Sequence, residues 1–265
     1  WENTLISPDY AGAMREEVER ATGAPCSFAL GACGDLGPQE GFVVDVEIAD
    51  RNGRQLGFAA LEALTGMGPP CTDLVYGGPV VSGATLGAWS RRPLAPDRNE
   101  SAARFAGGVS HVDLPFREGL ERTSLESELE SWLEKECGAD ASGDADRARE
   151  CGARAERARR WLARLDDHGE GGESYPLRFS VYRMGDAVWA TSGGEPFSLI
   201  QAELRRRFPD SMILLSPLAG DLQVGYMLPK ARFGLGLYQE ETASLGPGCL
   251  ETLIEALAGQ IRSLG

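Results

Sequence analysis

The chain has 265 residues, of which 42% are apolar, and this is enough for a sizeable core in one large domain or two small ones. Its net charge is −14 and its basic residues are dispersed, which argues against a nucleic-acid partner because phosphate binding needs a basic footprint. No apolar run approaches the roughly 20 residues that span a bilayer. The first residue is Trp1 rather than Met, so we expect the chain to begin inside a domain, which leaves the cellular compartment open.

The six cysteines form no CxxC pair, which argues against a zinc knuckle. Their density is far below that of disulfide-rich secreted scaffolds. Cys137 and Cys151 flank a segment rich in Gly, Asp and Ala, so a disulfide between them is one interpretation. Six free thiols are the simpler expectation.

The N-terminal part of the sequence predicts a helix, a strand, a turn and a second helix. Ser7-Pro8 is typical of a helix start, and Gly23 ends this first helix. Residues 26–30 are predicted as a short buried strand that runs into a glycine-rich turn over residues 31–38. The second helix is expected over residues 49–64, and its buried face would hold Leu56, Ala60, Leu61 and Leu64.

The middle of the sequence changes character. Residues 65–115 mix short strands with Gly/Pro turns, and residues 74–76 and 80–81 are strand-like. Residues 124–165 are rich in Glu, Arg, Ala and Leu, and glycines between 138 and 143 interrupt them. This pattern predicts an exposed helical hairpin, inserted at about residues 120–170 of a single domain, whose charged residues form a solvated face rather than a binding site.

The C-terminal part alternates strands and helices. A β-hairpin is predicted from residues 177–184 and 187–190, joined at Gly185-Asp186. A helix is expected over residues 195–208 and a buried strand over residues 212–215. The chain closes with an amphipathic helix whose apolar stripe is Leu250, Leu253, Ile254, Leu257, Ile261 and Leu264. Helices that alternate with short strands at both ends of the chain predict an α/β fold, a mixed sheet covered by helices.

Four residues are candidates for chemistry. Asp35 follows the first predicted strand in a loop whose glycines would let a ligand approach, or it caps backbone N–H groups of a tight turn. Glu195, at the predicted helix start, is a candidate metal ligand or general base, or a carboxylate that favours the helix dipole. Tyr226 follows the next strand, which would bring its phenol to the sheet edge of Glu195. Tyr226 and Tyr238 are otherwise core or rim aromatics.

Other catalytic sites are poorly supported. The chain has only two histidines, His111 in a strand-like stretch and His168 at a predicted helix end, so it does not supply a histidine-rich metal site by itself. A GxSxG elbow and a GxxxxGK[ST] loop are both absent from the sequence, which argues against a serine hydrolase and a phosphate loop.

Five segments share their order and spacing with a known family. They are WENTLISPDY (residues 1–10), GACGDLGP (31–38), GEPF (194–197), GYMLP (225–229) and LYQE (237–240). Together they resemble the neutral/alkaline non-lysosomal ceramidase family, over residues 1–64 and 177–264. The resemblance implies that the chain is the C-terminal portion of a zinc-dependent amidohydrolase domain, which splits ceramide into sphingosine and a fatty acid.

The resemblance also implies roles for single residues. The family holds its Zn²⁺ with two histidines, a glutamate and a tyrosine, and Glu195 and Tyr226 match the last two. Tyr238 matches an active-site tyrosine that helps to stabilise the oxyanion, while Asp35 would orient the substrate loop that includes Gly34 and Gly37. The histidine ligands, the general-base histidine and an arginine would precede Trp1, so we expect little activity from this chain alone.

Two positions depart from the family. Gly37 replaces the serine of Gly-Asp-x-Ser-Pro, and Gln223 replaces a tyrosine three residues before the ligand tyrosine. If the family serine is the nucleophile, its replacement by Gly37 makes this chain inactive. If a zinc-bound water attacks instead, the loss of the serine hydroxyl is tolerated. The expected substrate is ceramide or a related lipid or amide. The alternatives are a non-catalytic lipid- or carbohydrate-binding member of the same fold, or a structural partner that completes a site with another chain.

Overall fold

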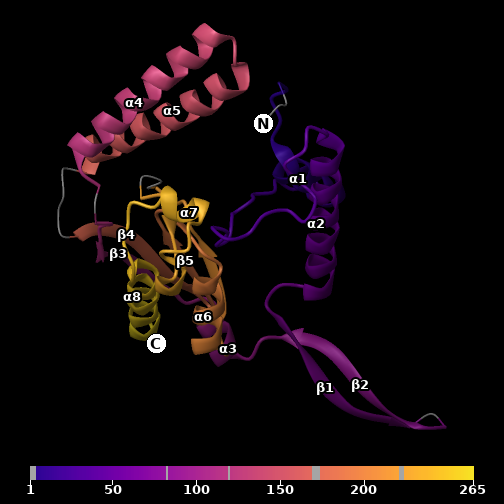
Figure 1. The fold of residues 1–265 in the computed structure, drawn as a ribbon. Helices are drawn as coiled ribbons and strands as arrows, with labels where there is room; N and C mark the ends of the chain where they lie inside the picture. Colours follow the sequence, from indigo (N-terminus) through magenta and orange to yellow (C-terminus); the bar gives the residue numbers. More distant parts are fainter. Residues whose placement is uncertain (1–3, 82, 119, 169–173, 221–223) are drawn as a thin grey trace. The chain divides into compact units, whose positions relative to one another are not determined.

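The computed structural model describes residues 4–81, 83–118, 120–168, 174–220 and 224–265 (Figure 1). The start of the WENTLISPDY segment and Gln223 therefore lie outside the described residues. The chain divides into two compact units, of which the first comprises Trp1–Leu30, Leu36–Ala106 and Arg183–Ala187, and the second comprises Gly31–Asp35, Gly107–Tyr182 and Val188–Gly265. No helix in the described ranges combines the length and the apolar composition that a membrane span requires.

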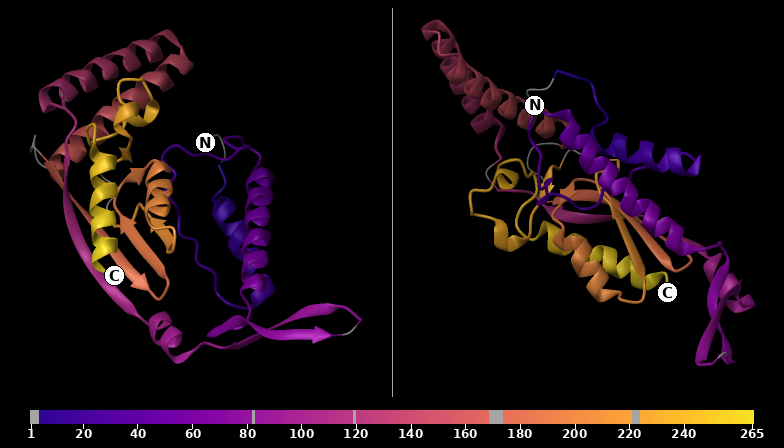
Figure 2. Two further views of the ribbon diagram at one scale, coloured as in Figure 1. Left: turned by 90° about the horizontal axis from the view of Figure 1, so that it is seen from below. Right: turned by 90° about the vertical axis from the view of Figure 1, so that its right-hand side faces the viewer.

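The main core of the molecule lies between a four-stranded sheet and two helices of the second unit. The strands are β3 (Phe105–Pro115), β4 (Ser174–Met184), β5 (Ala187–Ser192) and β7 (Met212–Ser216), in the order β3-β4-β5-β7. The helices α6 (Leu199–Arg207) and α8 (Cys249–Ser263) pack against each other, and α6 also contacts β7 (Figures 1 and 2). Alternate residues of β4, such as Leu177, Phe179 and Val181, join the apolar residues of both helices in one core. The predicted α/β fold is confirmed.

Helix α8 has the amphipathic pattern expected from the sequence. Its buried residues are Cys249, Leu250, Leu253, Ile254, Leu257, Ala258 and Ile261. These positions recur at intervals of three and four, so they form one apolar stripe that faces the core. Strand β7 is only half buried, because Ile213 and Leu215 face the core while Met212 and Leu214 are exposed.

The expected helix over residues 195–208 is wrong at its start. Glu195–Pro196 is instead a two-residue strand, β6, which pairs with β8 (Tyr226–Met227), and the helix begins at Leu199. The backbone N–H of Glu195 donates to the Gly225 carbonyl (2.8 Å), and that of Phe197 donates to the Met227 carbonyl (3.0 Å). These bonds require an extended backbone and compete with a helix start at Glu195.

The predicted helical hairpin is present. It consists of α4 (Arg122–Ser142) and α5 (Ala145–His168), and Gly143 ends α4 in the left-handed conformation (φ 75°). Glycine adopts this conformation without steric cost, which explains why the chain turns at Gly143. The considered disulfide does not form, because Cys137 and Cys151 are both free thiols, the first exposed and the second buried.

The first unit contains helices and a separate β-hairpin. Its elements are α1 (Asp9–Thr22), α2 (Val46–Met67), β1 (Thr72–Val81), β2 (Thr85–Pro93) and α3 (Pro96–Ala102), and β1 pairs antiparallel with β2. The strand expected over residues 26–30 is wrong. Side chains of α1 bind its first residue instead: the Cys26 backbone N–H donates to Glu19 (2.9 Å), and its carbonyl accepts from Arg15 (2.7 Å).

The expected buried face of α2 is also wrong. Leu56 is 41% exposed and Leu64 is 49% exposed, whereas the buried residues of this helix are Gly53 and Gly57. A Cβ atom on Gly53 would lie 2.2 Å from the carbonyl oxygen of Tyr10 in α1. Helices α1 and α2 therefore contact each other at glycines, which allow their backbones to approach more closely than leucines would.

Candidate functional site

The main chain places Glu195 beside Tyr226. Strands β6 and β8 are parallel, and Glu195 is opposite Tyr226 in their register, with Pro196 opposite Met227. Opposed residues of neighbouring strands share one face, so the carboxyl and the phenol meet. The two side chains lie close enough for each to influence the pKa of the other. The structure thus brings together the carboxylate and phenol that the sequence analysis paired.

A second backbone contact holds the glycine-rich loop against β6. The Gly34 backbone N–H donates to the Pro196 carbonyl at 3.0 Å. A Cβ atom at Gly34 would lie 2.7 Å from the Glu195 carbonyl oxygen, so a side chain here would push the loop away. The same loop brings the Cys33 sulfur within 3.9 Å of Glu195 Oε1.

Asp35 connects this loop to the start of α6. Its Oδ1 accepts the backbone N–H of Ser198 (2.6 Å), and its Oδ2 accepts the Ser198 hydroxyl (2.9 Å). Ser198 is the N-cap residue of α6, where unpaired N–H groups favour an anionic partner. Asp35 therefore fixes the loop to the helix that follows β6.

Tyr238 lies on the other side of Tyr226. It is the first residue of the short helix α7 (Tyr238–Glu241), and its side chain is 65% exposed. The two tyrosine rings meet edge to face, with centroids 6.1 Å apart. The next residue, Gln239, donates from its amide to the Gly34 carbonyl at 3.2 Å. Helix α7, strand β8 and the glycine-rich loop thus converge on the Glu195–Tyr226 pair.

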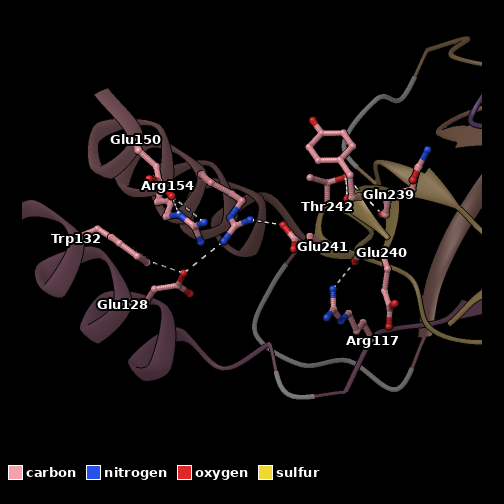
Figure 3. A network of polar contacts seen from close by, with 11 residues as sticks. Arg117, Glu128, Trp132, Glu150, Arg154, Gln239, Glu240, Glu241 and Thr242 are labelled. Carbon is pink, nitrogen blue, oxygen red and sulfur yellow. Dashed lines mark hydrogen bonds and ion pairs between the residues drawn. The ribbon is translucent and has the colours of Figure 1, made fainter. Parts of the chain in front are cut away.

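Arginines hold the segment that contains α7 (Figure 3). Arg157 of α5 bridges Glu241 (2.5 Å) and Glu128 of α4 (3.7 Å). Arg164 donates to the Thr242 carbonyl at 3.2 Å. Arg117, which precedes α4, donates to the Glu240 carbonyl at 2.5 Å. The charged face of the helical hairpin is therefore not wholly solvated, because two of its arginines position the segment that carries Tyr238.

Burial sets the protonation of this cluster. It raises the pKa of the Glu195 carboxyl, although hydrogen bonds with Tyr226 and Cys33 oppose the shift. Burial first, and then the negative charge of Glu195, raises the pKa of Tyr226 to about 12. Burial and Glu195 also raise the pKa of the Cys33 thiol. The negative charge of Glu195 thus makes ionisation of Tyr226 and Cys33 less favourable, whereas both of these groups favour the ionised form of Glu195.

This donor set fits part of a zinc shell. Zinc accepts carboxylate oxygens, and Glu195 holds one half-buried beside a phenol. Within the described ranges, no three His, Cys, Asp or Glu side chains are grouped to hold a metal, and His111 on β3 therefore belongs to no such group. Further ligands of a four-coordinate zinc would have to come from outside these ranges.

Sequence reasoning missed three members of the cluster, Cys33, Ser198 and Gln239. Cys33 and Glu195 are 162 positions apart, so only the tertiary fold joins them. The one available signal for Cys33 was its place beside Gly34 in a loop already singled out. Gly37, the departure from the family loop, belongs to the first unit, where a Cβ atom on it would lie 3.3 Å from the Phe42 ring.

Comparison with known proteins supports the fold alone. No family model and no curated protein matches the sequence. A solved neutral ceramidase from Pseudomonas aeruginosa is similar with a TM-score of 0.57 and 13% identity, covering 99% of this chain and 41% of that chain. A ceramidase complexed with C2 is similar with a TM-score of 0.57 and 12% identity, covering 99% of this chain and 43% of that chain. The chain thus spans about two fifths of these structures, and the expected ceramidase-like fold is confirmed.

Proposed function

We propose that this chain forms part of a zinc-dependent amidohydrolase site, which cleaves the N-acyl amide of ceramide or of a related lipid or amide. The observation that carries the proposal is the pairing of Glu195 with Tyr226, fixed by the parallel register of β6 and β8. The fold shared with two ceramidase structures supports the class of substrate.

Each residue has a separate task in this proposal. Glu195 and Tyr226 would hold Zn²⁺, which when bound would polarise the amide carbonyl of the substrate and lower the pKa of a bound water to about 7. The exposed hydroxyl of Tyr238 would donate a hydrogen bond to the oxyanion that develops on the amide. Asp35, through Ser198, keeps the glycine-rich loop against β6.

The test compares zinc content and hydrolysis of a fluorescent N-acyl-sphingosine in the full-length protein and its variants. Glu195→Ala should lose bound zinc and activity together. Glu203→Ala is the matched control, because Glu203 is a carboxylate of α6 that pairs with Arg206 and Arg207, and it should keep both. Full zinc and full activity in Glu195→Ala would refute the proposal.

Tyr238→Phe separates binding from catalysis. Loss of one oxyanion donor should lower kcat by about 100- to 1,000-fold while the zinc content stays unchanged. A variant with normal kcat would remove Tyr238 from the mechanism. Zinc bound without hydrolysis of any acyl-sphingosine would instead favour a non-catalytic lipid-binding member of the fold. We expect residues 1–265 alone to show little turnover, because the proposed site needs further zinc ligands besides Glu195 and Tyr226. Robust turnover by residues 1–265 would contradict this expectation.

A further inference from the structure

The hairpin of β1 and β2, in the first unit, carries exposed apolar side chains along most of its length. From Leu74 to Ser90 the sequence has no charged residue. The exposed large apolar residues of this stretch are Leu74, Val75, Tyr76, Val80, Val81, Leu86 and Trp89. Among the described strands, β1 and β2 pair only with each other (Figure 1). A two-stranded hairpin is marginally stable in water by itself, and clustered exposed apolar residues mark a surface that binds a partner.

Both faces of the hairpin are apolar near its tip. Val80 is opposite Leu86 in the strand register, and Val81 is opposite Thr85. Consecutive residues of a strand point to opposite faces, so the exposed side chains of Val80 and Val81 lie on different faces. A protein partner that pairs with the hairpin or packs on it would cover one edge or one face. A lipid layer surrounds the whole tip and therefore suits this arrangement better.

The polarity of the hairpin changes along its length in the order of a lipid–water interface. The aliphatic tip is followed by Tyr76 and Trp89, which are opposite each other with ring centroids 5.3 Å apart. An extended strand rises about 3.3 Å per residue, so Leu86 and Trp89 are separated by about 10 Å. Charges begin only at the base, where Asp73 is opposite Arg92. Tyrosine and tryptophan favour the headgroup level of a bilayer, between the acyl chains and the charged outer region.

We infer that the hairpin inserts its tip into the surface of a zwitterionic lipid layer, an inference that goes beyond the proposed function. Val80, Val81 and Leu86 would reach the boundary of the acyl chains, and the Tyr76–Trp89 pair would lie among the headgroups. Insertion stays shallow, because hydrocarbon cannot satisfy the backbone N–H and C=O groups at the free edges of a two-stranded hairpin. The opposed charges at the base and the net charge of −14 argue against attraction to anionic lipids.

Phosphatidylcholine vesicles test this inference on the full-length protein, with neither zinc nor hydrolysis as the readout. The wild-type protein should sediment with the vesicles. Val81→Asp and Leu86→Asp should each lower the partition coefficient about 10- to 100-fold, because each removes one aliphatic side chain from the acyl boundary. Met212→Asp is the matched control and should keep full binding, since Met212 is an exposed apolar residue of β7 in the second unit.

Tryptophan fluorescence assigns the contact to the hairpin. Phosphatidylcholine with brominated acyl chains should quench Trp89 when the wild-type protein binds. Trp89→Phe should lose this quenching and keep most of the vesicle binding. Trp132→Phe, which alters an aromatic residue of α4, should leave the quenching unchanged.

Three results would overturn the inference. They are absence of vesicle binding by the wild-type protein, equal binding by the wild type and both tip variants, and shielding of Trp89 from aqueous acrylamide before vesicles are added. Shielding would mean that a second copy or the rest of the protein already covers the hairpin. The changed tip side chains are exposed, so both variants should keep the wild-type circular dichroism spectrum. If a variant does not fold, quenching of Trp89 in the wild-type protein decides the question.

The same experiments keep this inference apart from the proposed function. Vesicle binding by a full-length protein that lacks zinc and turnover would contradict the proposed function and leave the role of the hairpin standing. Zinc-dependent hydrolysis by a protein that does not bind vesicles would do the reverse.

Discussion

Helices α8 and α2 both have leucines at helical spacing, but they bury different residues. Helix α8 has 15 residues and buries seven, five of them leucine or isoleucine, in the core of the second unit. Helix α2 has 22 residues and buries only Gly53 and Gly57, where α1 crosses it. Helix α8 is held in place by the burial of apolar side chains, whereas α2 is held by the close approach of its backbone to that of α1. An apolar stripe therefore does not by itself say how a helix packs.

This difference extends to the site. Glu195, Tyr226, Cys33 and Asp35 all belong to the second unit, where strand pairing and helix α6 fix their backbones. Functional side chains supported by packed elements keep their geometry without help from a ligand. We therefore expect changes in the core of this unit to disturb the site, and equivalent changes in α2 to leave it unaffected.

The largest effect is expected from truncation in α8. Leu253 is fully buried, so Leu253→Ala should lower the free energy of unfolding by about 2–5 kcal/mol through lost burial and a cavity. Leu64→Ala in α2 removes the same atoms from a half-exposed side chain and should cost about 0.5 kcal/mol or less. Denaturant unfolding measures both. Equal losses would contradict the contrast between the two helices.

The glycine contact in α2 should respond to a single methyl group. Gly53→Ala places a Cβ atom against Tyr10 and Ala13 of α1, and overpacking of this kind costs about 1–3 kcal/mol. Gly66→Ala is the matched control in the same helix, because its Cβ would meet open space. Alanine is the better helix former, so this control should be stabilised by up to about 1 kcal/mol. Thermal and denaturant unfolding should show a lower free energy of unfolding for Gly53→Ala and an unchanged or higher one for Gly66→Ala.

Two aspartates cap helices in the two units and offer a finer comparison. Asp35→Ala and Asp45→Ala should each cost about 1 kcal/mol of unfolding free energy, because each removes an acceptor for N–H groups at a helix start. Only Asp35 also anchors the loop beside Glu195. Alkylation of Cys33, followed by mass spectrometry, should therefore become faster in Asp35→Ala and stay unchanged in Asp45→Ala. Equal rates would argue against the anchoring role.

The smallest effect concerns pH. Burial raises the pKa of Glu195, so the folded chain without metal holds this proton more tightly than the unfolded chain does. Its stability relative to Glu195→Gln should therefore fall as the pH rises from the unfolded pKa of about 4.3 through the higher folded value. Glu203→Gln is the control with the opposite sign, because Arg206 lowers the pKa of Glu203. Unfolding measured across this range distinguishes the two slopes.

Local patterns predicted the elements that depend on local chemistry. The stripe of α8, the turn at Gly185-Asp186 and the break at Gly143 were all readable from the sequence. The strand at residues 26–30 was wrong because side chains of α1 bind that segment, and composition does not reveal such partners. The helix start at Glu195 was wrong because distant backbone groups compete for its hydrogen bonds.

The site was predictable only in part. The resemblance to ceramidases singled out Glu195, Tyr226 and Tyr238, and the structure brings these three side chains together. Cys33, Ser198 and Gln239 were missed because each reaches the site through a contact between segments far apart in the chain. Sequence periodicity describes one segment at a time, so it does not encode these contacts.

The two-residue pairing of β6 with β8 has a consequence for how this site can change. Main-chain bonds set the spacing of positions 195 and 226, and neighbouring strands lie about 4.8 Å apart whatever side chains they carry. The backbone therefore sets the spacing of these two positions independently of the side chains that they carry. Exchange of Glu195 or Tyr226 would change the functional groups that meet here and leave the spacing of the two backbone positions unchanged.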